Sequence, residues 1–236
     1  IIMALPKLNA PTYQITIPST GVTTQYRPFL VKEQKHLMMA QESEDLNEIA
    51  NTVSTLVEAC TNNTIQANSS PVFDIEYIFL KIRSKSVGET ARVIVTCPDD
   101  EKTKVPVTIP LDEVEVQMFD DHTNVVNVTD TIKIVMRYPT LNDYASYLKQ
   151  NDSKHIFDMI NQCVDEIHFD EKIYKRVDMT QKDVEEFIDQ MNTEQFQKVT
   201  QFFETMPRLR HEIKVTNPNT KVESEVMLEG LQSFLG

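Results

Sequence analysis

The order of its strand-like and helix-like patterns constrains this chain more than any other feature. The patterns predict, in sequence, a β-hairpin at 13–31, helices from 32 to 86, an antiparallel β region at 92–138, helices from 140 to 207 and a hairpin at 210–228. Strands and helices are therefore segregated rather than alternating. Such an order favours an α+β fold over a doubly wound parallel sheet. We expect an N-terminal β-hairpin, helices, a central antiparallel β region and a C-terminal helical region closed by a β-hairpin.

A division into two regions follows from the same order. We expect an N-terminal α+β region with central β-hairpins at residues 1–138 and a C-terminal helical region with the terminal hairpin at 139–236. These form either two units or one continuous domain. Thr140 and Asp143 have the spacing of a capping box and mark the start of the second region. The chain has 236 residues, of which 40% are hydrophobic, and this is enough to bury a sizeable core.

The helix at 70–86 has the clearest start and stop signals. We expect Ser70 to cap it, Pro71 to occupy its first position and Gly88 to end it. Apolar side chains at helical spacing predict the face that packs into the core: Ile75, Ile78, Phe79 and Ile82. Caps of other helices are expected at Ser43, Ser153, Thr180 and Thr193.

The charge balance excludes one class of partner. Asp and Glu exceed Lys and Arg by 36 to 23, which gives a net charge of −13. A nucleic-acid binder neutralises phosphates with clustered basic side chains, so we expect no nucleic acid as a partner. No apolar run approaches the ~20 residues of a membrane span, and the first residues lack the basic and apolar parts of a signal peptide. The sequence therefore predicts no membrane partner.

The cysteines indicate a reducing compartment. There are three of them, Cys60, Cys97 and Cys163, and an odd number of widely spaced thiols argues against a disulfide framework. Cys60 and Cys163 fall on apolar stripes at helical spacing, so both are expected to be buried. The second stripe consists of Ile156, Ile160, Val164 and Ile167 and predicts a helix that continues to residue 167.

Local motifs of catalysis and cofactor binding are absent from the sequence. The glycines are Gly21, Gly88, Gly230 and Gly236, and they lie too far apart for a loop that cradles phosphate. The sequence contains no G-x-S-x-G, H-E-x-x-H or C-x-x-C. We therefore expect no enzyme and no cofactor, and we assign no catalytic, cofactor-binding or metal-binding residues.

Two clusters of His, Asp and Cys residues nevertheless suggest an alternative function for the protein, that of a metal-dependent hydrolase. The first cluster consists of His155, Asp158, Cys163 and His168, and the second of Asp120, Asp121 and His122. In the first, His155 and Asp158 share a helix face, but Cys163 faces the core stripe. Ligand number and geometry favour solvated polar residues and a core thiol over a metal site. The second cluster is better explained by a turn before a strand.

Two predicted hairpins have similar sequences around their turns. Cys97-Pro98 is preceded by Val-Thr and followed by a polar turn and an alternating strand, and Asn217-Pro218 has the same surroundings. We call the segments 97–100 and 217–220 the two knuckles. Such knuckles hold zinc when each carries a cysteine pair. Here the first has one cysteine and the second none, so the sequence predicts two metal-free hairpins.

Two groups of apolar side chains are candidates for partner binding. Met38 and Met39 would form an adaptable apolar surface if exposed. Phe196, Phe202 and Phe203 are aromatic anchors of the kind found at interface centres. Helical spacing favours core packing for both groups, so the partner-binding residues remain open at this stage.

Stretches of distinctive sequence occur near the start, the middle and the end of the chain. They are Leu5-Pro-Lys-Leu-Asn-Ala-Pro-Thr-Tyr13 with Arg27-Pro-Phe-Leu-Val-Lys-Glu-Gln-Lys35, Phe73-Asp-Ile-Glu-Tyr-Ile-Phe-Leu-Lys-Ile-Arg-Ser-Lys-Ser-Val-Gly-Glu89, and Gln201-Phe-Phe-Glu-Thr-Met-Pro207 with Leu228-Glu-Gly-Leu-Gln-Ser-Phe234. In these stretches the chain resembles the baseplate-hub and hub-assembly proteins of T-even-type contractile-tailed bacteriophages. None of the stretches has a catalytic meaning.

The resemblance implies a protein that helps to build the hub of the tail baseplate by protein–protein contact. Its partners would be other baseplate hub proteins and the tape-measure protein. It would be either a structural subunit kept in the virion tail or an assembly chaperone that stays in the host cytoplasm. The resemblance also implies cysteine pairs in the two knuckles. This sequence departs from them at Asp100, Asn217 and Thr220, so zinc is not expected here.

Overall fold

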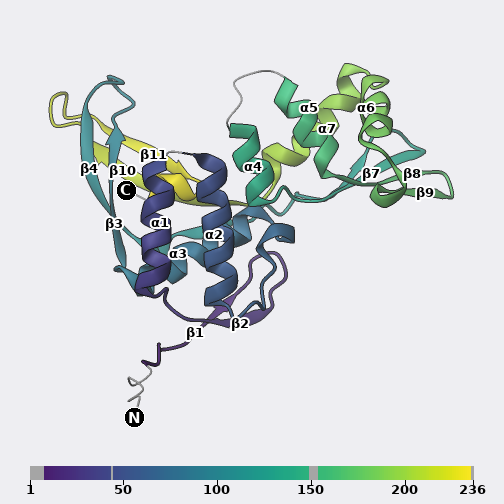
Figure 1. Cartoon of the computed structure of the whole chain (residues 1–236). Coiled ribbons are helices and arrows are strands. Elements are labelled where there is room, and N and C mark those ends of the chain that lie inside the picture. Colours follow the sequence, from purple (N-terminus) through teal and green to yellow (C-terminus); the bar gives the residue numbers. More distant parts are fainter. Residues whose placement is uncertain (1–7, 44, 149–153, 235–236) are drawn as a thin grey trace, which may run out of the picture.

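The computed structural model of the chain describes residues 8–43, 45–148 and 154–234 and confirms the α+β fold (Figure 1). The helices are α1 (Val31–Ser43), α2 (Leu46–Cys60), α3 (Val72–Ser86), α4 (Leu141–Leu148), α5 (Lys154–Cys163), α6 (Gln181–Asp189) and α7 (Thr193–Thr205). The strands are β1 (Tyr13–Thr16), β2 (Thr23–Tyr26), β3 (Thr90–Thr96), β4 (Lys104–Pro110), β5 (Glu115–Gln117), β6 (Val125–Asn127), β7 (Ile132–Met136), β8 (Val164–Phe169), β9 (Lys172–Lys175), β10 (Arg208–Thr216) and β11 (Glu223–Glu229). Short 3-10 helices are η1 (Ala67–Ser69), η2 (Leu111–Glu113), η3 (Arg176–Asp178) and η4 (Leu231–Phe234).

The strands form small antiparallel sheets rather than one large sheet. β1 pairs with β2 and β3 with β4, while β5 joins the terminal hairpin in the order β11-β10-β5. The remaining sheet has the order β6-β7-β8-β9. The predicted hairpins at both ends and the central antiparallel β region are therefore confirmed. No helix of the described residues has the length and apolar character to span a membrane.

Two hydrophobic cores lie in the described part of the chain. The first core gathers α2, α3, both hairpins β3–β4 and β10–β11, and the turn η4. The second core lies between the sheet β6-β7-β8-β9 and the helices α5, α6 and α7. Because β5 pairs with β10, the whole second core is inserted between two neighbouring strands. In the structure, we call the described residues of 8–117 and 208–234 the first region, and those of the insertion between β5 and β10 the second region. Figure 1 shows the two regions side by side, with α4 between them.

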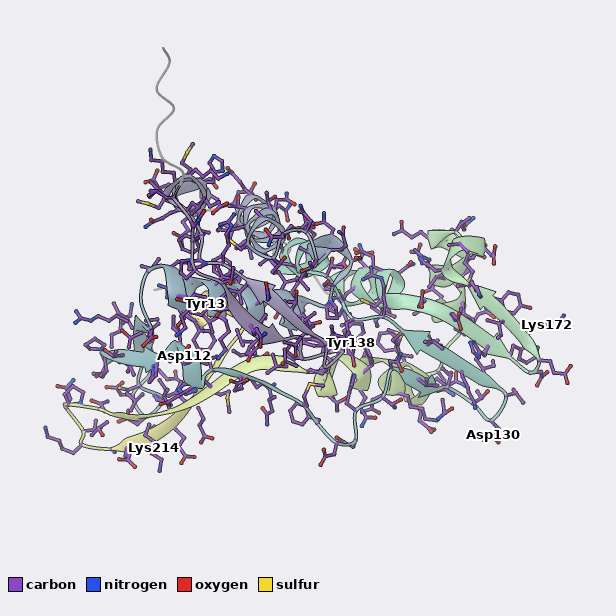
Figure 2. All side chains as sticks on the ribbon, turned by 90° about the horizontal axis from the view of Figure 1, so that it is seen from below. Tyr13, Asp112, Asp130, Tyr138, Lys172 and Lys214 are labelled. Carbon is purple, nitrogen blue, oxygen red and sulfur yellow. The ribbon has the colours of Figure 1, made fainter. Side chains whose placement is uncertain are left out.

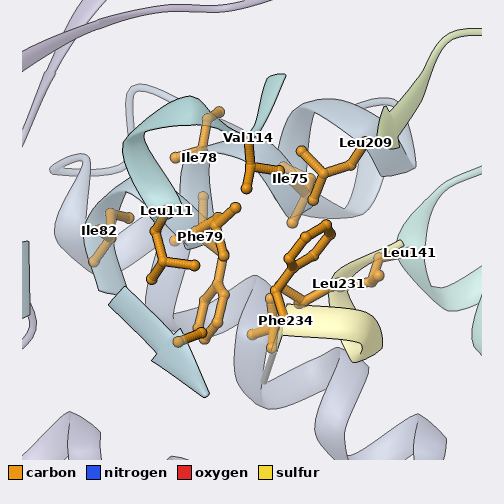
Figure 3. Close-up of a cluster of buried hydrophobic side chains, with 14 of the residues drawn as sticks. Ile75, Ile78, Phe79, Ile82, Leu111, Val114, Leu141, Leu209, Leu231 and Phe234 are labelled. Carbon is orange, nitrogen blue, oxygen red and sulfur yellow. The ribbon is translucent and has the colours of Figure 1, made fainter. Parts of the chain in front are cut away.

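Helix α3 is the centre of the first core. The predicted stripe of Ile75, Ile78, Phe79 and Ile82 is completely buried, and Figure 3 shows it among side chains from η2, β10, α4 and η4. Other faces of the helix are buried as well, so it is surrounded by protein rather than laid on a surface. A helix that is covered on all sides belongs to the interior of a fold.

The helix caps correct the prediction in several places. Asp45, not Ser43, caps α2 and accepts from the Asn47 backbone N–H at 2.8 Å. Ser70 does not cap α3; its hydroxyl donates to the Gln66 carbonyl, and Pro71 takes the cap position. Asn192 caps α7 one residue before the predicted Thr193. Asp45 and Asn192 have the polar side chain and the extended backbone that a cap requires, whereas Pro71 makes no side-chain cap hydrogen bond. The capping box of Thr140 with Asp143 is confirmed. Thr180 is confirmed as the cap of α6, and the structure adds a capping box with Asp183. Ser153 lies outside the described residues.

The prediction of one helix through residue 167 was wrong. α5 ends at Cys163 and β8 follows at once, so Val164 and Ile167 belong to a strand. The pairing of β8 with β7 shifts register between Val135 and Met136, which leaves an extra residue, Asp165, in β8. Such a bulge lets two positions three residues apart face the same side of a sheet. The bulge therefore imitates helical spacing.

The predicted boundary at residues 138 and 139 stays a prediction. β7 lies before it and β8 after it, yet both strands share one sheet. Each core also takes residues from both sides of the boundary: Leu141 and Leu209 pack in the first core, and Val126 and Ile134 in the second. The pairing of β5 with β10 suggests a different division, in which the residues between these two strands form one unit and the rest of the chain the other.

Candidate functional site

The residues considered for a metal site do not come together in the described structure. Asp158 is exposed on α5, whereas Cys163 is buried in the second core, and this burial raises the pKa of its thiol to about 12. His168 lies on β8, where its Nε2 is 2.7 Å from Glu166 Oε2. The side chain of His155 lies outside the described residues. Among those that are described, no three His, Cys, Asp or Glu side chains are grouped around a possible metal position.

The segment Asp120-Asp121-His122 forms the predicted turn, but His122 also has a structural contact that the sequence did not indicate. Its Nδ1 is 3.0 Å from Thr205 Oγ1 on α7, and its Nε2 is 3.0 Å from Tyr138 Oη. Burial lowers the pKa of the imidazole, which favours its neutral form. His122 thus uses both ring nitrogens in contacts within the fold.

His122 is part of an aromatic junction that joins the two cores; we define this junction as Phe73, His122, Tyr138 and Phe202. The ring of Tyr138 meets Phe73 of α3 edge-on, with 5.1 Å between centroids. It stacks on Phe202 of α7 and on His122, at 5.5 Å in each case. Aromatic pairs at such distances contribute about 0.5–1.5 kcal/mol beyond their buried area. The junction therefore fixes α3 of the first region against α7 of the second.

The two knuckles touch each other. Asn217 is fully buried, and its Nδ2 donates to the Asp99 carboxylate at 2.9 and 3.1 Å. Thr220 Oγ1 donates to the same carboxylate, and Asn219 Nδ2 donates to Thr103 Oγ1 at 3.0 Å. Hydrogen bonds from Thr220 and Asn217 lower the pKa of Asp99, so it stays ionised. We call these side chains the knuckle contact.

The knuckle contact does not fit a zinc ion. The positions at which cysteine pairs would lie hold Cys97, Asp100, Asn217 and Thr220, and amide and hydroxyl groups are not the ligands of structural zinc. Asp100 is already engaged, because it accepts from the backbone N–H groups of Lys102 and Thr103 at 3.0 and 2.9 Å. Polar hydrogen bonds thus join the tips of the two hairpins, and the absence of a metal here stays a prediction.

Two acidic side chains of α3 are buried, which the sequence did not reveal. Asp74 accepts from the backbone N–H of Ser19 at 3.0 Å and from the Ser19 hydroxyl. Glu76 accepts from the backbone N–H of Leu231 at 2.9 Å, and burial raises the pKa of Glu76 to about 7. Partners 55 and 155 residues away give no local signal along the chain.

Glu76 faces a pocket of about 180 Å³ between α2, α4 and the turn after β11. The walls are mostly apolar and include Ile49, Val53 and Leu141. The turn passes close to the carboxylate at Gly230, whose φ is +72°. A side chain here would be strained, and its Cβ would lie 3.5 Å from Glu76 Oε1. No motif in the sequence indicates this pocket.

The two groups of candidate partner-binding residues have opposite outcomes. Met38 and Met39 on α1 are 53% and 64% exposed, so core packing was the wrong expectation for them. Phe202 and Phe203 are buried in the second core and Phe196 is partly buried, so core packing is confirmed for these aromatics. α1 therefore presents an exposed methionine pair, which we call the α1 surface.

A second exposed apolar surface lies on the hairpin β8–β9 and the short helix after it. Ile173 is 55% and Val177 89% exposed, and Phe169 and Tyr174 are partly open to solvent. β9 pairs with β8 on one side and ends the strand order of its sheet. Figure 2 places Lys172 of this hairpin at the opposite end of the molecule from Lys214. A dense run of β-branched and aromatic residues around Asp170 and Glu171 is the signal that could have revealed it.

Comparison with known proteins gives one family. The model of the family described as "T4 bacteriophage base plate protein" matches residues 10–236, which is nearly the whole chain. No curated protein and no solved structure matches. The match covers both cores and both exposed surfaces described above.

Proposed function

Because the chain belongs to the T4 bacteriophage base plate protein family, we propose that it helps to assemble the baseplate hub through protein–protein contact and without catalysis. The observation that carries this proposal is the presence of two separate apolar surfaces on one small protein. The α1 surface lies on the first region, and the exposed β8–β9 hairpin lies on the second. A protein with two such surfaces is suited to hold two partners at once.

The chemistry of the two surfaces supports different modes of contact. Methionine side chains are flexible and polarisable, so the side chains of the α1 surface can change rotamer to fit the surface of a partner. The β8–β9 hairpin instead offers the outer edge of β9 in the described sheet, flanked by Lys172 and Lys175. A strand edge can accept a strand of another protein. Other baseplate hub proteins and the tape-measure protein are the proposed partners.

Affinity purification after co-expression with the other hub proteins tests the proposal. We expect at least one hub or tape-measure protein to co-purify with the wild-type chain. Met38→Lys should weaken this capture, because it places a charge on the α1 surface. Met118→Lys is the matched control: Met118 is 54% exposed, against 53% for Met38, and lies outside both surfaces. The proposal is wrong if no such protein co-purifies and hub assembly proceeds normally after deletion of the gene.

Mass spectrometry of purified virions separates the two forms of the proposal. A structural subunit is retained in the finished particle at a fixed ratio to other baseplate proteins. An assembly chaperone binds during assembly in the host cytoplasm and is released. Peptides of this chain in the tail baseplate fraction would support the first, and their absence there, with capture of hub proteins in infected cells, would support the second.

A further inference from the structure

The pocket beside Glu76 has the chemistry of a binding site for a single side chain. Its volume of about 180 Å³ is below the roughly 300–1,000 Å³ typical of pockets for small molecules. α2 and α4 supply apolar walls with Ile49, Val53 and Leu141, and the pocket is partly open to solvent. A site of this size and shape suits the anchor residue of a partner protein.

The inner wall of the pocket is acidic. Glu76 and Glu229 both line it, and no basic side chain does so among the described residues. Glu229 is already neutralised, because it forms ion pairs with Arg208 and with Arg210, the latter at 2.8 Å. Glu76 forms no ion pair in the described part of the chain, and its contact is the backbone N–H of Leu231. The carboxylate of Glu76 is therefore the group that an arriving side chain would meet.

We propose that this pocket receives a lysine side chain from another baseplate protein, with the methylene groups on the apolar walls and the ammonium group on Glu76. A lysine combines an apolar stem with a compact charged end, which matches apolar walls that lead to one carboxylate. Arginine fits less well. Its guanidinium favours two oxygens of a carboxylate, and Leu231 already uses one oxygen of Glu76.

Burial of Glu76 agrees with this assignment. Burial raises the pKa of Glu76 to about 7 although the charge of Arg208 acts to lower it, and no ion pair of Glu76 is present in the described residues. An ammonium group within hydrogen-bond distance would supply a counter-charge. The inference rests on the proposed function for the identity of the partner, whereas the chemistry of the pocket can be tested without any partner protein.

The first experiment uses n-butylammonium as the probe, with n-butanol as a neutral probe of similar shape. Binding is followed by NMR through the methyl groups of Ile49, Val53 and Leu141. We expect n-butylammonium to shift these signals in a saturable way and to bind more tightly than n-butanol. Glu76→Gln should weaken the ammonium by about tenfold or more, as expected for the loss of a charge-assisted hydrogen bond.

Glu58→Gln is the matched control for this variant. Glu58 also accepts a backbone N–H, from Ala67 at 2.9 Å, but does not line the pocket. It should bind n-butylammonium as the wild type does. Equal binding of the two probes by the wild type, or an unchanged affinity in Glu76→Gln, would overturn the proposal.

A second variant keeps the test valid if Glu76→Gln fails to fold. Ala50→Met adds a larger, flexible side chain to the pocket wall and keeps Glu76 unchanged. It should abolish binding of the ammonium probe while the NMR spectrum of the second core stays unchanged. If a hub protein co-purifies equally well with the wild type and Ala50→Met, the proposed function stands and the pocket is not its contact site.

Discussion

The two cores of this protein are built from different parts of the chain. The first joins residues near the start with residues near the end, so that Ile15 and Phe234 share one cluster. The second is assembled from residues 126–206 alone. The second core can form from contacts that are close in sequence, whereas the first needs pairing across the whole insertion. Non-local contacts cost more loop-closure entropy, so we expect the first region to be the more sensitive to a lost contact.

The largest expected effect is at the centre of the first core. Phe79→Ala removes a fully buried ring from α3 and should cost about 3–5 kcal/mol. Urea unfolding, followed by hydrogen exchange for each region, measures the loss and shows whether amides of the second core keep their protection. Phe157→Ala, at an exposed ring on α5, is the control, with an expected loss of about 1 kcal/mol or less. A loss below about 1 kcal/mol for Phe79→Ala would show that this face of α3 is exposed.

The second effect is a pH dependence of the free energy of unfolding, caused by Glu76 in the first region. The pKa of Glu76 is raised from 4.5 to about 7, so the folded protein binds more protons than the unfolded chain between these values. Stability from this group therefore falls as pH rises through that window, by up to about 3 kcal/mol. Glu76→Gln should flatten the change in unfolding free energy between about pH 5 and 7. Glu58→Gln should keep the slope of the wild type; an unchanged slope in Glu76→Gln would contradict the prediction.

Carboxylates whose pKa is lowered in the folded protein affect its stability at pH values below the range in which Glu76 titrates. Hydrogen bonding to Arg27 lowers the pKa of Glu33, so its contribution to stability is lost as pH falls through the lowered value. The hydrogen bond and charge of Arg208 lower the pKa of Glu229 against its burial, with the same sign. The raised pKa of Glu76 makes stability fall as pH rises, and the lowered pKa values of Glu33 and Glu229 make it fall as pH drops. Together they predict a stability maximum on the mildly acidic side of neutral pH.

A smaller effect is expected where the two hairpins of the first region meet. Asn217→Ala removes the buried amide that donates to Asp99 and should cost about 1–2 kcal/mol. It should also loosen the tips of β3–β4 and β10–β11, seen as faster hydrogen exchange there. Asn219→Ala, which removes an exposed contact of the same knuckle, should cost less. An equal cost for both would show that burial of Asn217 is not what matters.

The smallest effect concerns the second region. Thr180→Ala removes one half of the capping box of α6 and should cost about 1 kcal/mol. The loss should appear in the hydrogen exchange of α6 and leave the first core unchanged, because the buried side chains of α6, Val184 and Ile188, belong to the second core. Thr200→Ala, at a half-buried position of α7 outside any cap, is the control. Loss of protection in both cores would contradict the separation of the two regions.

Local patterns predicted the elements of this fold well, and non-local contacts explain what they missed. The α3 stripe and the cap at Thr180 depend on neighbours within one helix, so the sequence identified both. Val164 and Ile167 were misassigned because a bulge, set by pairing with β7, reproduces helical spacing. The pocket at Glu76 was not predicted, because its walls come from segments that are distant in the sequence. Met38 and Met39 are adjacent on α1, and the side of α1 that packs is decided by its contact with α2.

The position of Phe234 in the first core has a consequence for how the protein is made. Its ring is fully buried against residues that the ribosome produces more than a hundred positions earlier. During translation, the second core can close as soon as residue 206 has emerged, while α3 and its apolar stripe still wait for β10, β11 and η4. The part of the nascent chain that is synthesised first therefore completes its core last. Until η4 has been synthesised, the apolar residues of this part remain exposed to aggregation.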